Sequence, residues 1–312
     1  MGLSRLLLAV LAALPPPGAA QSAPPAEVRP AAPSRLDTAL LLADAKALAS
    51  PAFEGRRPGT PGHRRAQDYV LRRLKASGLP PLARTVSLRY LVGDGGVNFA
   101  VVAKGTVHPD VCFLVTAHYD HLGVLDGRLH PGADDNASGT AAVLALAAWF
   151  RAHPPRHTLV FALFDDEERG MFGSRAFVAA APWKPLKPRL DLNADMLSRS
   201  DRGELWISGL RSFPAWKAVF EPLAGKVPVV LRFGHDVPRR PRPDEDWSEA
   251  SDHVSFVKAG IPALYVGVED HEDYHRPTDT FERMHKDFYL RACEALLRIV
   301  EAADAAGAEA PG

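Results

Sequence analysis

The sequence predicts an α/β fold, a three-layer sandwich in which helices flank a mostly parallel central β-sheet. Two observations support this prediction. Segments with helical periodicity alternate with short β-rich runs, the order expected when parallel strands are joined by crossover helices. Some of the β-rich runs, such as residues 110–119 (DVCFLVTAHY), are almost continuously apolar, as a strand buried on both faces requires.

The elements follow one another from residue 36 onward. Predicted helices cover 36–50, 61–78, 140–150, 173–181, 213–224, 251–260 and 286–303. Predicted strands cover 84–92, 97–104, 110–119, 157–164, 189–197, 204–209, 227–233 and 261–267. The helix at 61–78 opens with Pro61 and closes at Gly78, which are typical start and stop residues.

Composition places the chain among globular proteins. Of its 312 residues, 46% are hydrophobic, and 37 basic residues balance 37 acidic ones. This zero net charge gives no electrostatic footprint for nucleic acid, so we expect no nucleic-acid partner. Residues 36–306 contain no repeat and no long linker, which predicts a single domain.

The N-terminal segment is typical of a secretory signal peptide. Arg5 precedes an apolar run from Leu6 to Leu14, and a small-residue cleavage site follows at 18–20. We therefore expect residues 1–20 to be removed and the mature protein to be secreted or periplasmic, without stable membrane insertion. The apolar run is too short to favour an uncleaved anchor. Residues 21–35 are rich in Pro and Ala and predict a disordered or extended lead-in, and 307–312 a disordered tail.

Cys112 and Cys293 are the two cysteines of the chain. Each lies within an apolar pattern and is interpreted first as a small buried hydrophobic residue. A disulfide between them is allowed in a secreted protein, but free thiols are favoured.

Acidic and imidazole side chains lie where the predicted strands end. His118 and Asp120 end one strand and Glu167 and Glu168 follow another, while Asp195, His275 and the pair Asp134-Asp135 hold similar positions elsewhere. Since ligands gather at the carboxyl ends of strands in such sheets, we expect these groups to converge.

This set of donors predicts a metal site. Imidazole nitrogens and carboxylate oxygens are ligands for Zn²⁺. A single tetrahedral site would leave some of these carboxylates without a metal to bind, whereas two metals that share a bridging carboxylate would bind them. Asp134 is the residue expected to bridge. The same donors would also accept Co²⁺ or Mn²⁺.

Six motifs in order give the chain a recognisable resemblance. His118 with Asp120, GADDNASG, EERGMFGS, NADM, SDHVSF and YHRPTDT together resemble the M28 family of di-zinc aminopeptidases. The resemblance covers roughly Leu36 to Ala303 and includes FEGRRPGTPGHRRAQDYV, which is typical of bacterial members. It implies the three-layer fold of zinc-dependent exopeptidases.

The resemblance also implies roles for individual residues. His118 and Asp195 would bind one zinc, Glu168 and His275 the other, with Asp134 bridging and Asp135 supporting the turn, where relatives often have a cis peptide. Glu167 would be the general base, Asp120 would orient His118, and Tyr274 would polarise the scissile carbonyl. Water held between the zinc ions would lose a proton to Glu167 and attack the peptide bond. The expected partners are peptides with a free N-terminus, and the oligomeric state is left open.

Other polar residues nearby are interpreted first as structural. This applies to His121, His253, His271 and Asp252, although Asp252 and His253 would also suit an outer shell of the site. Asp165 and Asp166 are interpreted as a turn. Residues 232–250 are dense in Pro and charge, so a surface loop and a lid over the substrate pocket stay equally open, with Trp247 as a wall.

Other functions remain open on the same scaffold. A glutaminyl cyclase uses a related fold with one zinc, and a dipeptidase or carboxypeptidase differs in pocket residues that these motifs do not contain. A catalytically silent peptide-binding ectodomain is the non-enzyme alternative. Glu167 argues against silence, because silent relatives tend to lose the base or the ligands.

Overall fold

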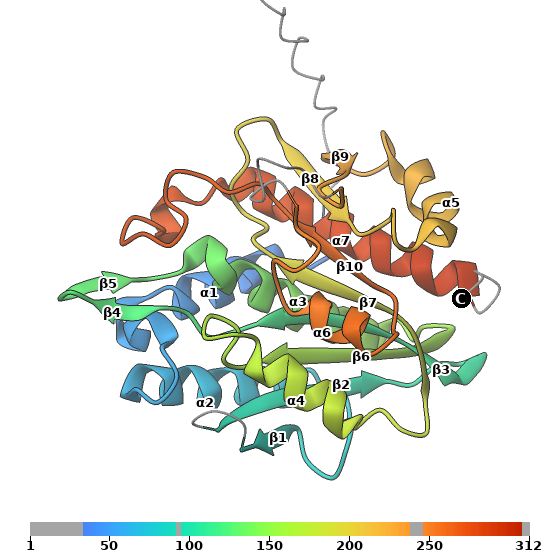
Figure 1. Cartoon of the computed structure of the whole chain (residues 1–312), viewed down its shortest axis with the longest axis horizontal. Coiled ribbons are helices and arrows are strands. Elements are labelled where there is room, and N and C mark those ends of the chain that lie inside the picture. The colour runs from blue at the N-terminus through green and yellow to red at the C-terminus, as the bar shows by residue number, and fades with distance from the viewer. Residues whose placement is uncertain (1–33, 92–94, 238–245, 308–312) are drawn as a thin grey trace, which may run out of the picture.

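The computed structural model describes residues 34–91, 95–237 and 246–307 (Figure 1). The predicted signal peptide at 1–20 lies outside the described residues, as do most of the lead-in, the end of the tail and the middle of the 232–250 loop. The described chain begins two residues before the predicted domain boundary. There the guanidinium of Arg35 contacts the carboxylates of Glu294 (2.9 Å) and Glu301 (2.8 Å) on the C-terminal helix.

A mixed sheet forms the centre of the described molecule. Its eight strands have the order β1-β2-β6-β3-β7-β10-β8-β9. They are β1 (Ser87–Tyr90), β2 (Gly96–Ala103), β3 (His108–His118), β6 (His157–Phe164), β7 (Lys187–Asp195), β8 (Glu204–Ser208), β9 (Val230–Phe233) and β10 (Ala263–Gly267). The central strands β6, β3, β7 and β10 are mutually parallel, whereas β1, β2 and β8 each run antiparallel to a neighbour. The predicted α/β class is confirmed, with a mixed rather than purely parallel sheet.

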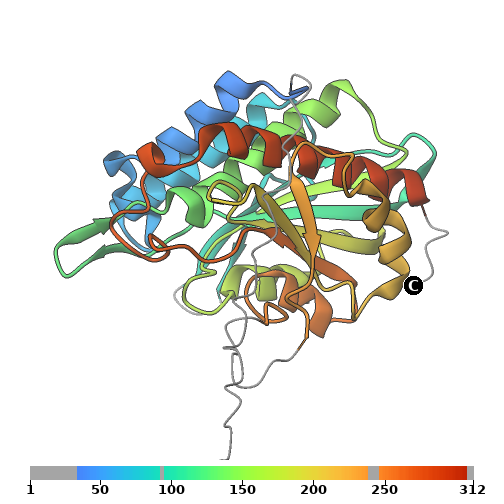
Figure 2. The ribbon, with the colours of Figure 1, turned by 90° about the horizontal axis from the view of Figure 1, so that it is seen from above.

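Helices cover both faces of the sheet, as Figure 2 shows. One face carries α1 (Thr38–Leu48), α2 (Pro61–Ala76), α3 (Gly139–Ala152) and α7 (Lys286–Ala306), with the short α5 (Lys217–Phe220) beside α7. The other face carries α4 (Phe172–Ala180) and α6 (His253–Lys258), packed on each other. These layers confirm the predicted three-layer sandwich.

Local sequence signals explain where the helices begin. The side chain of Asp37 accepts a hydrogen bond from the N–H of Leu40 (3.0 Å) at the start of α1, and Thr60 does the same for His63 (3.1 Å) at α2. Gly139 opens α3 against the end of β7, where a Cβ would lie 2.3 Å from the carbonyl oxygen of Ala194. This close approach puts the turn before α3 beside the strand that ends at Asp195.

A small hairpin was not predicted. Strands β4 (Gly123–Leu125) and β5 (Arg128–His130) pair antiparallel around Asp126-Gly127, outside the central sheet. The hairpin joins β3 to the turn before α3.

Two further sequence expectations concern the interior and the membrane. Cys112 and Cys293 are both buried and free, as favoured. Over the described ranges, no helix combines the length and the apolar character needed to cross a bilayer.

Candidate metal centre

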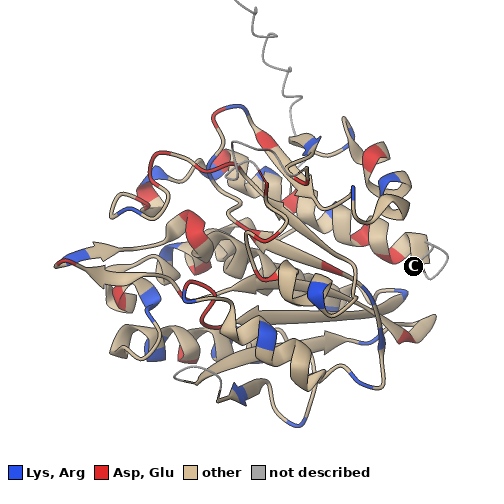
Figure 3. Ribbon diagram, viewed as in Figure 1, with Lys and Arg blue, Asp and Glu red and all other residues tan. Residues whose placement is uncertain are grey.

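The predicted side chains come together at the carboxyl ends of the central strands. His118 is the last residue of β3 and Asp195 the last residue of β7. Glu167 and Glu168 lie in the loop after β6, and His275 lies in the loop after β10. Figure 3 shows acidic residues in these loops near the middle of the sheet. The topology thus explains why residues distant in sequence meet here.

The first group of ligand atoms surrounds the imidazole of His118. Its Nε2 lies 3.3 Å from an oxygen of Asp135 and 3.3 Å from an oxygen of Asp195. All three residues are buried, and their ligand atoms lie within 4.8 Å of one another. One metal ion would fit among them.

The second group shares the carboxylate of Asp135. Its other oxygen lies 3.0 Å from Nε2 of His275, which is also 3.3 Å from an oxygen of Glu168. His121 joins this group, since its Nδ1 lies 2.5 Å from the second oxygen of Glu168. A carboxylate with one oxygen facing each group has the position of a bridge between two metals.

The structure corrects the position expected for Asp134. One oxygen of its carboxylate accepts the N–H of Ser198 (2.6 Å), and the other lies 3.0 Å from Nε2 of His271. The adjacent Asp135 has extended backbone angles (φ −103°, ψ 99°), so consecutive side chains point in opposite directions. Asp134 therefore anchors the loop after β7, and Asp135, which was expected only to support the turn, faces both ligand groups. The Asp135-Asn136 peptide bond is cis.

Asp120 ties two site loops together. Its carboxylate accepts the backbone N–H groups of Glu167 (3.1 Å) and Glu168 (3.4 Å). Nδ1 of His118 lies 3.6 Å from the same carboxylate, which is an ion-pair distance rather than a hydrogen bond. Asp120 thus fixes the loop of the proposed base, and its predicted role in orienting His118 stays a prediction.

Glu167 lines a cavity of about 420 Å³ together with the ligand groups. Burial raises the pKa of its carboxyl well above the usual value, and the charges of Asp252 and Asp195 raise it further. A carboxyl that binds a proton readily beside a reacting centre is suited to proton transfer.

Other walls of this cavity are aromatic. Trp247 and Tyr265 pack on each other with ring centroids 5.1 Å apart. Tyr274 stacks on His275, with centroids 3.9 Å apart, and burial raises the pKa of its phenol. Trp247, for which the sequence left the roles of surface loop and pocket wall equally open, lines this cavity. The carbonyl-polarising role of Tyr274 stays a prediction.

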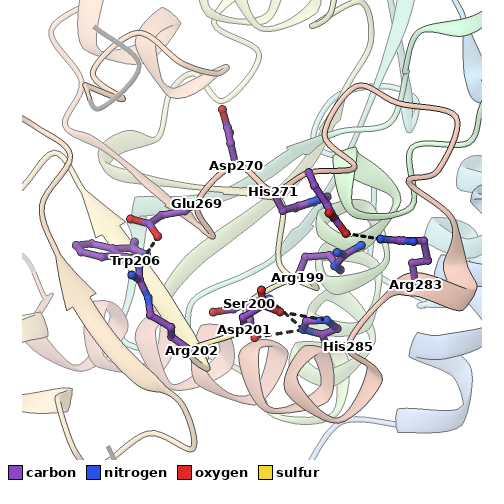
Figure 4. A pocket seen from close by; sticks show the side chains of 11 residues that line it. Arg199, Ser200, Asp201, Arg202, Trp206, Glu269, Asp270, His271, Arg283 and His285 are labelled. Atoms are coloured by element: carbon purple, nitrogen blue, oxygen red, sulfur yellow. Dashed lines mark hydrogen bonds and ion pairs between the residues drawn. The ribbon is translucent and has the colours of Figure 1, made fainter. Parts of the chain in front are cut away.

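A second, more polar cavity of about 670 Å³ adjoins the first and is drawn in Figure 4. Asp270 lines both cavities. Arg199 and Arg283 line the second cavity, and the guanidinium groups of both contact the carboxylate of Asp273, that of Arg283 at 2.7 Å. Since Asp273 lies two residues before His275, these ion pairs hold the His275 loop against the segment after β7.

Two residues that position the site were not predicted. Arg56 is completely buried, and its guanidinium donates to the carbonyl oxygens of Tyr119 (2.8 Å), Pro131 (2.7 Å) and Gly132 (2.8 Å). Burial lowers the pKa of Arg56 to about 10. Asp279 accepts the N–H groups of Asp134 and Asp135. Both lie inside motifs that the sequence analysis quoted without assigning them a role.

The electrostatics of the site fit a divalent cation. Burial opposes protonation of His118, but Asp195, Asp120 and Asp135 outweigh it and raise the pKa of His118 well above its usual value. For His275, Asp135 and Glu168 overcome burial in the same way and raise the pKa to about 10. The carboxylates thus demand compensating positive charge, and metal ions held by these N and O donors would supply it.

Sequence comparisons place the chain in a known protein family. The family model described as peptidase family M28 matches residues 98–300. Aminopeptidase YwaD of Bacillus subtilis is 29% identical over 216 residues, which are 65% of this chain and 44% of that protein. The chain therefore spans less than half the length of this relative.

Solved structures share the fold. The match to the LapA aminopeptidase of Legionella pneumophila covers 86% of this chain and 72% of the LapA chain, with a TM-score of 0.65 and 16% identity. The match to the glutaminyl cyclase of Fimbriiglobus ruber covers 88% of this chain and 99% of the cyclase chain, with a TM-score of 0.67 and 20% identity. At these identities the likeness concerns the fold alone.

Proposed function

The chain belongs to peptidase family M28, and from this premise we propose that it is a zinc-dependent aminopeptidase that hydrolyses the N-terminal residue from peptides. One observation carries the proposal. The carboxylate of Asp135 lies between two ligand groups, with His118 and Asp195 on one side and Glu168 and His275 on the other. That arrangement suits two Zn²⁺ ions with Asp135 as the bridge, and Co²⁺ or Mn²⁺ would fit the same donors.

Glu167 is the proposed general base and acid. Two zinc ions held here would supply a strongly acidified water and polarise the scissile carbonyl. The carboxylate of Glu167 would accept the proton of the attacking water and deliver it to the nitrogen of the leaving amine. Asp120 would hold Glu167 in place through the hydrogen bond from its backbone N–H. The hydroxyl group of Tyr274 would donate a hydrogen bond to the developing oxyanion.

The substrate would occupy the 420 Å³ cavity. Trp247, Tyr265 and Met196 line it and would contact the side chain of the first residue. The carboxyl group of Asp270 lines the same cavity. We propose that the free α-amine of the peptide binds beside this acidic wall, so that an acetylated N-terminus would be rejected.

We also propose that the protein acts outside the cytoplasm, secreted or in the periplasm. The support is the charged, apolar and small-residue pattern of residues 1–20, which lie outside the described residues.

The testing experiment measures hydrolysis of aminoacyl chromogenic amides, each with a free or an acetylated N-terminus. The purified protein is assayed as prepared, after chelation, and after Zn²⁺ is restored. Zinc-dependent cleavage of the free-amine substrates alone is the expected result. Equal cleavage of the acetylated substrates would overturn the aminopeptidase assignment.

Two further substrates separate the alternatives. Cyclisation of a peptide with N-terminal Gln would identify a glutaminyl cyclase, and cleavage of dipeptides alone would identify a dipeptidase. A protein that binds zinc and peptide but turns over none of these substrates would be a silent binding protein.

A further inference from the structure

We propose that His121 is a third imidazole ligand of the metal pair, bound through Nδ1 to the ion that Glu168 and His275 hold. The inference rests on the proposed function, because it assumes that the cluster binds metal. It goes beyond the five ligands expected from the motifs. It makes the two sites unequal, with two imidazoles at one ion and one at the other.

Geometry brings His121 to the same carboxylates as His275. Nδ1 of His121 lies 2.5 Å from Glu168 and 3.7 Å from Asp135. Nε2 of His275 faces the other oxygen of Glu168 at 3.3 Å and the same oxygen of Asp135 at 3.0 Å. Ligand atoms of His121, Asp135 and Glu168 all lie within 4.8 Å of one another, close to the span that bonds of about 2.0 to 2.2 Å to one ion allow.

The imidazole of His121 is built into the site. It is completely buried, and all of its polar contacts are on the side of Glu168, since Nε2 has no hydrogen-bond partner among the described residues. A Cβ at Gly132 would lie 2.4 Å from the His121 ring, so only glycine leaves room for it there. The positive φ of Gly132 (60°) also favours glycine.

A rival role for His121 is hydrogen bonding alone. In that role Nδ1–H would donate to Glu168 and orient it as a ligand, which is a common function of residues around metal sites. The two roles differ in one observable, the number of imidazoles bonded to metal. Three imidazoles on two ions give about 1.5 per zinc, and two give about 1.0.

Unequal sites also predict unequal affinities. Donor type and geometry govern how tightly a site holds a borderline ion such as Zn²⁺ or Co²⁺. We expect the ion beside His121 and His275 to bind first and the ion beside His118 to bind second.

The experiment counts imidazoles by zinc X-ray absorption on the protein loaded with two zinc equivalents and measures both dissociation constants by competition with a chromogenic chelator. The test variant is His121→Gln, whose amide can still donate a hydrogen bond to Glu168. A matched control is His130→Gln, because His130 lies in the nearby hairpin with its Nδ1 on the carbonyl of Arg128 (3.1 Å).

We expect the wild type and His130→Gln to have about 1.5 imidazoles bonded per zinc. His121→Gln should have about 1.0, with one dissociation constant raised at least about 10-fold and the other unchanged. About 1.0 imidazole per zinc in the wild type would overturn the inference. So would a His121→Gln variant whose imidazole count and dissociation constants equal those of the wild type. Wild type with three bonded imidazoles and no peptide hydrolysis would support the inference while overturning the proposed function.

Discussion

The carboxylate of Asp279 accepts a hydrogen bond from the backbone N–H of Asp135, at 3.1 Å. The same carboxylate accepts the N–H of Asp134 at 2.9 Å. Asp279 lies after β10 and Asp135 lies before α3, so this pair of hydrogen bonds joins two loops that each carry a proposed ligand. The turn that presents Asp135 is therefore held from outside, by a residue that contacts no ligand atom.

This contact predicts that Asp279→Asn weakens metal binding without removing a ligand. An asparagine amide would turn an N–H donor toward a position where a carboxylate oxygen now accepts an N–H, and it would remove the negative charge that both backbone N–H groups face. We expect zinc affinity to fall about 10-fold to 100-fold, the usual effect of changing a residue that supports metal ligands. Equilibrium dialysis would measure it, with the fully exposed Asp201→Asn as control. Unchanged zinc affinity in Asp279→Asn would contradict the prediction.

The two neighbouring aspartates allow a direct test of which one bridges. Asp135→Asn should lose both metals, because its carboxylate faces both ligand groups. Asp134→Asn should keep two zinc equivalents, and the loss of the negative charge that faces His271 and the N–H of Ser198 should lower the free energy of unfolding by about 1 to 3 kcal/mol. Metal analysis would measure the zinc content of both variants. Loss of both metals in Asp134→Asn and their retention in Asp135→Asn would restore Asp134 as the bridge.

The sequence predicted the layers and the edge of the sheet where the site lies, because hydrophobic periodicity reports burial directly. Sequence periodicity could not tell Asp134 from Asp135. Which of two adjacent carboxylates faces the cluster depends on backbone angles in one turn, and those depend on contacts from Asp279 and Arg56 that are distant in sequence. The hairpin was within reach, since Asp126-Gly127 between short apolar runs is a strong hairpin signal.

Arg56 and His121 illustrate a different limit. An arginine in a polar segment is normally solvent-exposed, and nothing in its neighbours shows that its guanidinium binds carbonyl oxygens from the loops that carry the ligands. His121 follows Asp120 directly, so its proximity to His118 was visible. Its contact with Glu168, 47 residues away, was not.

Glu167→Gln should separate metal binding from catalysis. The amide fills the same space but cannot accept the proton of the attacking water, so kcat should fall at least about 100-fold and up to about 10,000-fold. The zinc content should remain at the wild-type value, because Glu167 is not one of the proposed zinc ligands. Steady-state kinetics and metal analysis on one preparation give both numbers, with the exposed Glu249→Gln as control. Activity near the wild-type value would exclude Glu167 as the base.

Tyr274 and Tyr265 line the same cavity, and their phenylalanine variants form a matched pair. If the Tyr274 hydroxyl stabilises the oxyanion, Tyr274→Phe should lower kcat about 100-fold with little change in KM. Tyr265→Phe should leave kcat and KM near their wild-type values, since it keeps the ring that forms a wall with Trp247. A large loss of kcat in Tyr265→Phe alone would move the carbonyl-polarising role to that residue.

His253 predicts a loss of stability in mild acid. It is 3% exposed, and burial lowers its pKa to about 4, although the carbonyls of Trp247 and Ser248 oppose the shift. Between pH 6.5 and about 4 the unfolded chain binds a proton that the folded chain excludes, so stability falls as pH decreases through this window, by up to about 3 kcal/mol. Urea unfolding of metal-free protein at pH 7.5, 6 and 5 would measure it, because chelation removes any contribution from metal release. His253→Gln should flatten the profile, whereas the control His153→Gln, at an exposed position, should keep the wild-type slope. Equal slopes in wild type and His253→Gln would show that another group controls acid stability.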